Sequence, residues 1–178
     1  MLYGLISRGY KAGGINSEPS LQPQDRAFNT ELMWNFEIGL KGTWMNGQLQ
    51  GQLSAFNQER KDIQIKQSLV SEREDSFASD FVDYIGNSAR GSNYGLELET
   101  IWMVNSRLSV FMNLGLLETE YNIPGAELLN RREQAHAPTY QLYLGAEYIL
   151  NDNLSLNLEM EGKDEFYLSS SHQERSDS

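Results

Sequence analysis

The sequence predicts an all-β fold, an antiparallel up-and-down meander of about seven strands that forms part of a transmembrane β-barrel. Three observations predict it. Apolar and polar residues alternate over long segments, several apolar faces carry an aromatic residue near both ends, and tight turns alternate with long polar connections. Long connections on one rim and short turns on the other are typical of an outer-membrane β-barrel.

The segment 31–44 shows the alternation most clearly. From Trp34 onward its even positions are mostly apolar, whereas its odd positions include Asn35, Glu37 and Lys41. Because side chains of a strand point to opposite faces in turn, this segment has one apolar and one polar face. Trp34 and Trp44 border the apolar face, and ten residues of a tilted strand climb roughly 25 Å, about the height of the apolar band of an outer-membrane barrel.

Segments 92–104 and 139–150 repeat this layout, each with an aromatic residue near both ends of its apolar face. Aromatic side chains with a polar group favour the boundary between membrane and water. We therefore expect the aromatic girdles of the membrane to include Trp34, Trp44, Tyr94, Trp102, Tyr140 and Tyr148.

The order of strands and connections follows from the same pattern. The expected strands are 2–9, 31–44, 48–64, 92–104, 107–119, 139–150 and 154–167. Asn, Asp and Gly tolerate positive φ and predict tight turns near 46–47, 105–107 and 151–153. The long polar segments 10–30, 65–90 and 121–138 are expected to be loops.

Composition excludes several classes of protein. The net charge of −11 argues against a nucleic-acid surface and against an anchor to anionic lipid. The sequence contains no cysteine, so it has no disulfide framework, thiolate metal site or cysteine nucleophile. It contains no apolar run of about 18 residues, the length that a membrane helix needs.

Several strings of the sequence resemble the barrel of TonB-dependent outer-membrane receptors. These are LYGLISRGYKAGGIN, WNFEIGLKGTW, GQLSAFNQERKDIQI, NSARGSNYGLELETIW, AHAPTYQLYLGAEY and FYLSSSH, and they extend over nearly the whole chain. The resemblance implies a receptor, not an enzyme, that takes up an iron–siderophore complex or another scarce nutrient with energy from TonB. It implies outer-membrane lipid as a further partner, and we expect no cofactor.

The sequence also departs from that family. Members are expected to have a barrel of 22 strands that encloses an N-terminal plug, preceded by a segment that binds TonB. None of these parts, no signal peptide and no final aromatic strand end is evident in residues 1–178. The expectation is therefore an internal fragment of the barrel domain, without an export signal of its own, from a receptor of the bacterial outer membrane.

Candidate chemical sites are few. His136 beside Arg131, Arg132 and Glu133 could contact an anion, but a solvated loop histidine is the preferred interpretation, and His172 lies near the end of the chain. Two sets of carboxylates each allow two interpretations. The first set could line a hydrated lumen wall or provide the carboxylate pair of a glycosidase. The second set could belong to a solvated loop or bind a cation. The first set is Glu37, Glu97, Glu99, Glu147, Glu159 and Glu161, and the second is Glu72, Glu74, Asp75, Asp80 and Asp83.

The hydrated wall and the solvated loop are the preferred interpretations, so we expect neither catalytic nor metal-binding residues. The residues that bind ligand are not identified by any motif. Two other functions remain open from the sequence. The first is a passive porin or a barrel enzyme of the outer membrane, and the second is a soluble β-barrel that binds a small apolar ligand in its core.

Overall fold

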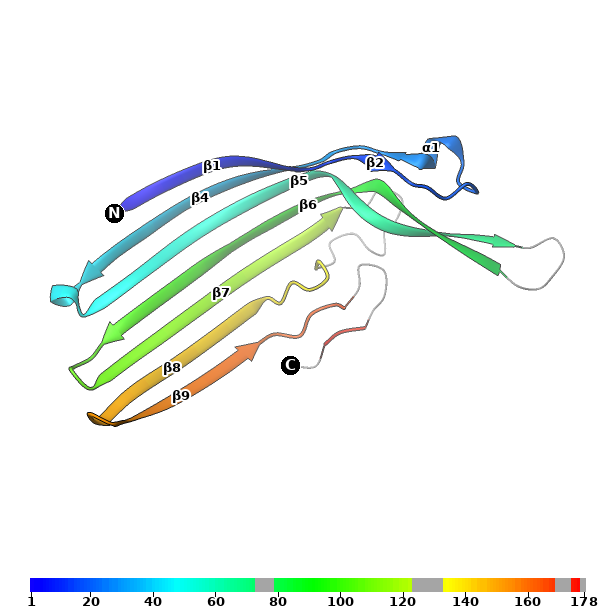
Figure 1. Cartoon of the computed structure of the whole chain (residues 1–178). Coiled ribbons are helices and arrows are strands. Elements are labelled where there is room, and N and C mark those ends of the chain that lie inside the picture. Colours follow the sequence, from blue (N-terminus) through cyan, green and yellow to red (C-terminus); the bar gives the residue numbers. More distant parts are fainter. Residues whose placement is uncertain (73–78, 123–132, 169–173, 177–178) are drawn as a thin grey trace.

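In a computed structural model that describes residues 1–72, 79–122, 133–168 and 174–176, seven long strands form one curved antiparallel sheet (Figure 1). Each strand pairs with its neighbour in the meander, which confirms the predicted all-β class and strand order. β1 and β9 lie at the two edges, so the sheet is not closed. The strands are β1 (Leu2–Lys11), β4 (Glu31–Trp44), β5 (Leu49–Glu72), β6 (Ser79–Met103), β7 (Leu108–Asn122), β8 (Tyr140–Asn151) and β9 (Leu154–Lys163).

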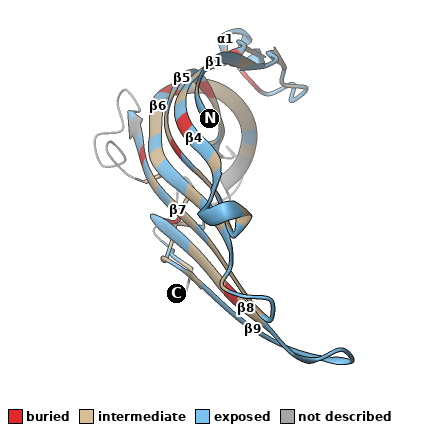
Figure 2. Cartoon of the chain, turned by 90° about the vertical axis from the view of Figure 1, so that its left-hand side faces the viewer, coloured by how far each residue is buried: buried red, intermediate tan, exposed pale blue. Residues whose placement is uncertain are grey.

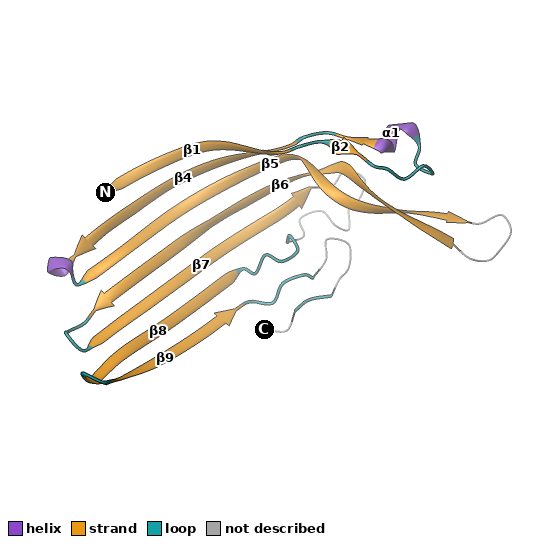
Figure 3. Ribbon diagram, viewed as in Figure 1, coloured by secondary structure: helices purple, strands orange, loops and turns teal. Residues whose placement is uncertain are grey.

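Short turns connect the strands at one end of the sheet, here called the turn rim (Figure 3). The 3-10 turn η1 (Met45–Gly47) has positive φ at Asn46 (55°) and Gly47 (96°), as the Asn-Gly pair predicts. In the next turn the Asn105 side chain accepts hydrogen bonds from two following backbone amides, at 2.8 and 3.0 Å. Asn151 accepts one in the same way at 3.0 Å. The three predicted tight turns are therefore confirmed.

The opposite end, here called the loop rim, carries the long connections (Figure 1). The prediction of a loop over 65–90 was wrong, because β5 extends to Glu72 and β6 begins at Ser79. A bulge around Asp62, whose φ is 55°, separates the sheet from this extension. A two-stranded ribbon in water needs no continuous apolar face, so its polar composition hid the strands.

Two further expectations need correction. The expected loop 10–30 contains β2 (Gly14–Ile15), α1 (Pro23–Arg26) and β3 (Ala27–Phe28). The expected strand 154–167 ends at Lys163, because β8 begins at Tyr140 and offers no strand partner beyond that point. Within the described residues, no helix is long and apolar enough to cross a membrane.

The sheet is a single layer, so it encloses no central core (Figure 2). The buried apolar residues of the described chain include Leu21, Ile63 and Ala89, all at or beyond the loop rim. Many large apolar side chains of the strands are exposed instead. One face of the sheet is therefore apolar without any protein layer to cover it.

Candidate functional site

The strand register gathers the apolar residues on one face of the sheet, here called the apolar face. A single cross-strand row shows this, since it carries leucine on six consecutive strands before it reaches Gly162 of β9. The row consists of Leu2, Leu40, Leu53, Leu98, Leu114 and Leu142. An uninterrupted apolar row of this width indicates contact with an apolar medium, because exposing so much apolar surface to water is unfavourable.

All six aromatic residues singled out from the sequence lie on the apolar face. They alternate in register with polar residues, near both ends of β4 and β8 and near both ends of the part of β6 that pairs with β7. Their side chains are exposed, from 37% at Trp34 to 50% at Tyr94. Their positions fit the girdle prediction, which the structure alone does not test.

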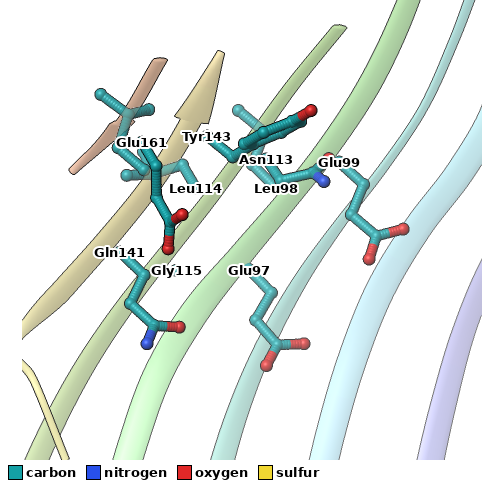
Figure 4. A pocket seen from close by; sticks show the side chains of 10 residues that line it. Glu97, Leu98, Glu99, Asn113, Leu114, Gly115, Gln141, Tyr143 and Glu161 are labelled. Atoms are coloured by element: carbon teal, nitrogen blue, oxygen red, sulfur yellow. The ribbon is translucent and has the colours of Figure 1, made fainter. Parts of the chain in front are cut away.

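The opposite face, here called the polar face, carries the predicted carboxylates in the same register. Glu97 and Glu99 of β6, Glu161 of β9 and Tyr143 of β8 line a hollow of about 440 Å³ (Figure 4). Tyr3 donates a hydrogen bond of 2.8 Å to Glu37 on the same face. This arrangement forms a hydrophilic wall, as the preferred interpretation of the sequence expected.

Glycines of the polar face make room for aromatic rings. A Cβ added to Gly145 would overlap the ring of Phe111 on the neighbouring strand, and one added to Gly39 would overlap the ring of Tyr3. The Phe111 ring also stacks against Tyr143 with centroids 5.8 Å apart. These close approaches explain why glycine interrupts strands that otherwise carry larger residues.

A buried ion pair lies on the polar face at the loop rim. Arg60 of β5 donates hydrogen bonds to Glu31 of β4 through Nε at 2.9 Å and through Nη2 at 2.5 Å, both to Oε1. The second carboxylate oxygen of Glu31 accepts the backbone amide of Gln64 at 3.0 Å. The side chain of Glu31 is only 8% exposed, whereas that of Arg60 is 23% exposed. The pair therefore joins two strands at the start of the bulge.

The same arginine holds a segment that precedes β8, here called the strap (residues 133–139). Arg60 Nη1 donates to the side-chain oxygen of Gln134 at 3.1 Å. Gln134 is buried, and its side-chain amide donates to Asn93 at 2.6 Å, while its backbone amide donates to the Thr119 hydroxyl at 2.8 Å. One residue of the strap is thus bonded to β5, β6 and β7 together.

The first connection is bonded to the extension of β5 and β6. The Asn16 side chain donates to the carbonyls of Asp25 and Ile85 and accepts the amide of Ile85, all at 2.8 to 2.9 Å. Gln64 donates to the carbonyl of Asn29 at 3.1 Å, and the Asn87 side chain does so at 3.0 Å. These bonds, together with the buried side chain of Leu21, order the connection beside the ribbon.

On the ribbon itself, an exposed ion pair joins the two strands. The Lys66 ammonium lies 2.6 Å from the Asp83 carboxylate, which also accepts the Ser68 hydroxyl at 2.5 Å. These hydrogen bonds lower the pKa of Asp83 below its usual value of 3.8. The group is solvated, so the pair reports on local charge and not on a binding pocket.

The two predicted histidine positions have different outcomes. His136 lies in the strap with φ of 59°, donates its backbone amide to the Tyr167 carbonyl at 2.9 Å, and has its ring 5.8 Å from that of Phe166. Nearby, Arg175 donates hydrogen bonds to the Tyr167 hydroxyl and to Glu165, and these bonds raise the pKa of the Arg175 guanidinium. His136 is thus an exposed residue of the strap with one ring contact. His172 lies outside the described residues.

Other predicted candidates are only partly described. Arg131, Arg132, Glu74 and Asp75 lie outside the described residues. Within the residues that the structure describes, no group of three or more His, Asp or Glu side chains is placed to hold a metal ion.

Sequence reasoning missed the residues that join the strap to the strands. Glu31 and Arg60 lie at strand positions without a recognisable motif, and Gln134 lies in a segment expected to be a loop. A weak signal was present, since Glu31 and Arg60 occupy the polar side of segments predicted to be adjacent strands. Their contact depends on the register between β4 and β5, which alternation alone does not set.

Comparison with protein families gives one result over nearly the whole chain. The family model described as "TonB dependent receptor-like, beta-barrel" matches residues 1–177.

Solved structures of similar fold are receptors. The chain is similar to the ferric yersiniabactin uptake receptor FyuA from Yersinia pestis, with a TM-score of 0.74 and 20% identity over 98% of this chain and 25% of that chain. It is also similar to the siderophore receptor PiuA from Acinetobacter baumannii, with a TM-score of 0.70 and 12% identity over 93% of this chain and 24% of that chain. For the siderophore receptor PirA from the same organism the TM-score is 0.58, with 14% identity over 93% of this chain and 26% of that chain. The chain thus spans about a quarter of the length of these receptors, and the likeness shows their fold.

Proposed function

Since the chain belongs to the TonB-dependent receptor family, we propose that it forms part of the wall of an outer-membrane receptor that actively imports a ferric siderophore or a similar scarce nutrient. The match of the barrel model over residues 1–177 carries this proposal. The family and the three similar structures are transport receptors and not enzymes, and the names of those structures specify siderophores.

In this proposal the apolar face contacts the lipid of the outer membrane. The leucine row supplies the middle of the apolar band, and Trp34, Trp44, Tyr94, Trp102, Tyr140 and Tyr148 supply aromatic girdles near its borders. The loop rim then lies outside the cell and the turn rim in the periplasm, because outer-membrane barrels have their longer loops outside.

The proposed receptor is longer than this chain. β1 and β9 each pair on one side only within the described sheet. An open strand edge in lipid leaves backbone groups without partners, each at a cost of several kcal/mol, so further strands must complete the barrel. We therefore propose that residues 1–178 form part of a barrel that also encloses a plug, and that the plug segment connects the receptor to TonB.

The polar face would line the lumen of that barrel. Its carboxylates then act as a hydrated wall around the hollow bordered by Glu97, Glu99 and Glu161. The strap and the extended ribbon of β5 and β6 lie at the outer opening, where an arriving ligand first meets the protein (Figure 1).

The test is nutrient uptake by cells that produce the receptor containing this chain and no other receptor for ferric siderophores. Ferric yersiniabactin is the first probe, followed by a panel of hydroxamate, catecholate and carboxylate ferric siderophores. We expect uptake of radiolabelled iron from at least one complex, and we expect it to stop when TonB is deleted or the proton gradient is dissipated. Uptake that continues under both conditions would indicate a passive porin. A folded receptor that imports none of these complexes would refute the proposed substrate class.

A further inference from the structure

We propose that Arg60 and Gln134 form a clasp that an anionic, oxygen-rich ligand opens, so that ligand arrival loosens the strap on the polar face. This inference rests on the proposed uptake function and adds a ligand-contacting group to it. In the free receptor, Arg60 Nη1 donates to the side-chain oxygen of Gln134. In the proposal, an oxygen of the ligand replaces that acceptor.

The bonding of Arg60 is divided between two roles. Nε and Nη2 donate to Glu31, which is buried and fixed by the amide of Gln64. This ion pair holds the guanidinium in place and orients its remaining edge. Nη1 instead donates to Gln134 at 3.1 Å, the longest of the three contacts and the one to a neutral acceptor. The arginine is therefore anchored on one side and exchangeable on the other.

Charge decides which acceptor Nη1 prefers. The bond from the Arg60 guanidinium to Gln134 is already charge-assisted at the donor, but an anionic oxygen adds the attraction between two unlike charges, which a neutral amide oxygen does not supply. A carboxylate, hydroxamate or catecholate oxygen would therefore displace Gln134 from Arg60. The Arg60 side chain is 23% exposed, so such a ligand reaches it without unfolding the sheet.

The wall around the clasp contains further polar groups. Asn35, Gln58, Asn93 and Thr119 form one cross-strand row on the polar face. Asn93 and Thr119 accept hydrogen bonds from Gln134, and Gln58 accepts one from Asn93 at 3.3 Å. The side-chain oxygen of Asn35 is buried and has no hydrogen-bond partner among the described residues. The row therefore places both donors and acceptors beside a ligand bound to Arg60.

Loss of the Arg60 contact would remove one of the three hydrogen bonds of Gln134, and so would loosen the strap, which keeps the bonds to Asn93 and Thr119 and the buried Pro138. Among the described residues, the strap is further held by the His136 amide on Tyr167, by Glu133 at 3.5 Å from Arg175 and by the Thr139 carbonyl, which accepts Leu117 N–H. The ring contact of His136 with Phe166 adds a small apolar contact. Gln134 alone contacts three strands of the sheet.

The experiment measures amide hydrogen exchange of the strap in the folded receptor, with sodium citrate as the probe and sodium chloride at equal ionic strength as the control. Citrate should accelerate exchange at the strap in the native receptor by about fivefold, the effect of roughly one kcal/mol, and should have no effect in the Arg60→Met variant. Gln134→Ala should give fast exchange without citrate. Gln134→Glu gives Arg60 a charged acceptor that citrate displaces less readily, so it should weaken the response to citrate; it also removes the donor to Asn93, so the response is compared with exchange of the same variant in chloride.

The same variants are then compared in the uptake assay. If the clasp acts on ligand entry, Gln134→Glu raises KM by about fivefold while kcat is little changed, and Arg107→Gln, which removes an exposed charge from the turn rim, changes neither. If amide hydrogen exchange of the strap in the native receptor is equally fast in citrate and in chloride, the clasp proposal is refuted, even where uptake proceeds. Absence of uptake with a citrate-dependent strap refutes the proposed function and leaves the anion-responsive clasp in place.

Discussion

Replacing Leu98 with arginine would put a charge in the middle of the apolar face. Leu98 lies four residues from Tyr94 and four from Trp102 along β6. Four residues of a strand tilted by about 40° climb about 10 Å, so Leu98 lies near the midplane between the two aromatic positions. Its cross-strand neighbours are Leu53 and Leu114, which offer the arginine no polar partner.

The expected cost follows from this depth. An arginine at the bilayer midplane destabilises an outer-membrane barrel by about 2–4 kcal/mol, and the penalty falls to about 0–1 kcal/mol near the interface. About 3 kcal/mol lowers the ratio of folded to unfolded receptor by more than a hundredfold. Thr100→Arg lies two residues closer to Trp102 on the same face, so it should cost about half as much as Leu98→Arg.

The assay is unfolding of the complete receptor in lipid vesicles by guanidinium, followed by tryptophan fluorescence. The matched control is Asn113→Arg, which introduces the same side chain on the polar face opposite Glu99. We expect Asn113→Arg to change the free energy of unfolding by no more than about 0.5 kcal/mol. Equal destabilisation by Leu98→Arg and Asn113→Arg would refute the assignment of the apolar face to lipid.

Three further predictions concern the loop rim. Arg60→Ala should destabilise the local structure by about 2–4 kcal/mol, because it leaves the buried Glu31 carboxylate with one hydrogen bond. Hydrogen exchange around the bulge measures this loss, and a change below about 1 kcal/mol would contradict the prediction. Lys66→Gln should raise the lowered pKa of Asp83 toward 3.8, as a carboxyl NMR titration would show. The pKa of Asp83 is lower in the folded state than in the unfolded state. Its contribution to ribbon stability is therefore present above pH 3.8 and is lost as the pH falls through the folded pKa. An unchanged titration of Asp83 in the variant would exclude Lys66 as the cause of the lowered pKa. Asn16→Ala removes three hydrogen bonds to the first connection and β6, so proteolysis within 12–30 should become faster, whereas Asn153→Ala at the turn rim should leave it unchanged.

The strands inside the proposed membrane band could be predicted from the sequence because one physical rule governs them. A strand between lipid and an aqueous lumen must alternate apolar and polar side chains, so the pattern from Trp34 to Trp44 announces both the strand and its two faces. The turn rim was also predictable, since positive φ at Asn46 and Gly47 requires residues that tolerate it. Family resemblance was readable for the same reason, as the strings that carry it are mostly strand patterns.

Beyond the loop rim this rule no longer applies, and the predictions there were wrong or absent. The ribbon of β5 and β6 extends past the sheet and contacts the first connection through polar groups such as Asn16, so polar residues form strands that look like a loop in the sequence. Glu31, Arg60 and Gln134 are as far as 103 residues apart in the chain. They meet only because the register between strands fixes Arg60 beside Glu31 and because the chain returns across the polar face before β8.

The sequence by itself therefore determined the strand order, the apolar face, the turn rim and the class of protein, because each depends on local alternation or on turn residues. The tertiary structure decided the length of the ribbon, the bonding of the first connection to it, and the clasp between Arg60 and Gln134. Those features depend on register and on hydrogen bonds between distant segments, and no periodicity in the sequence encodes such contacts.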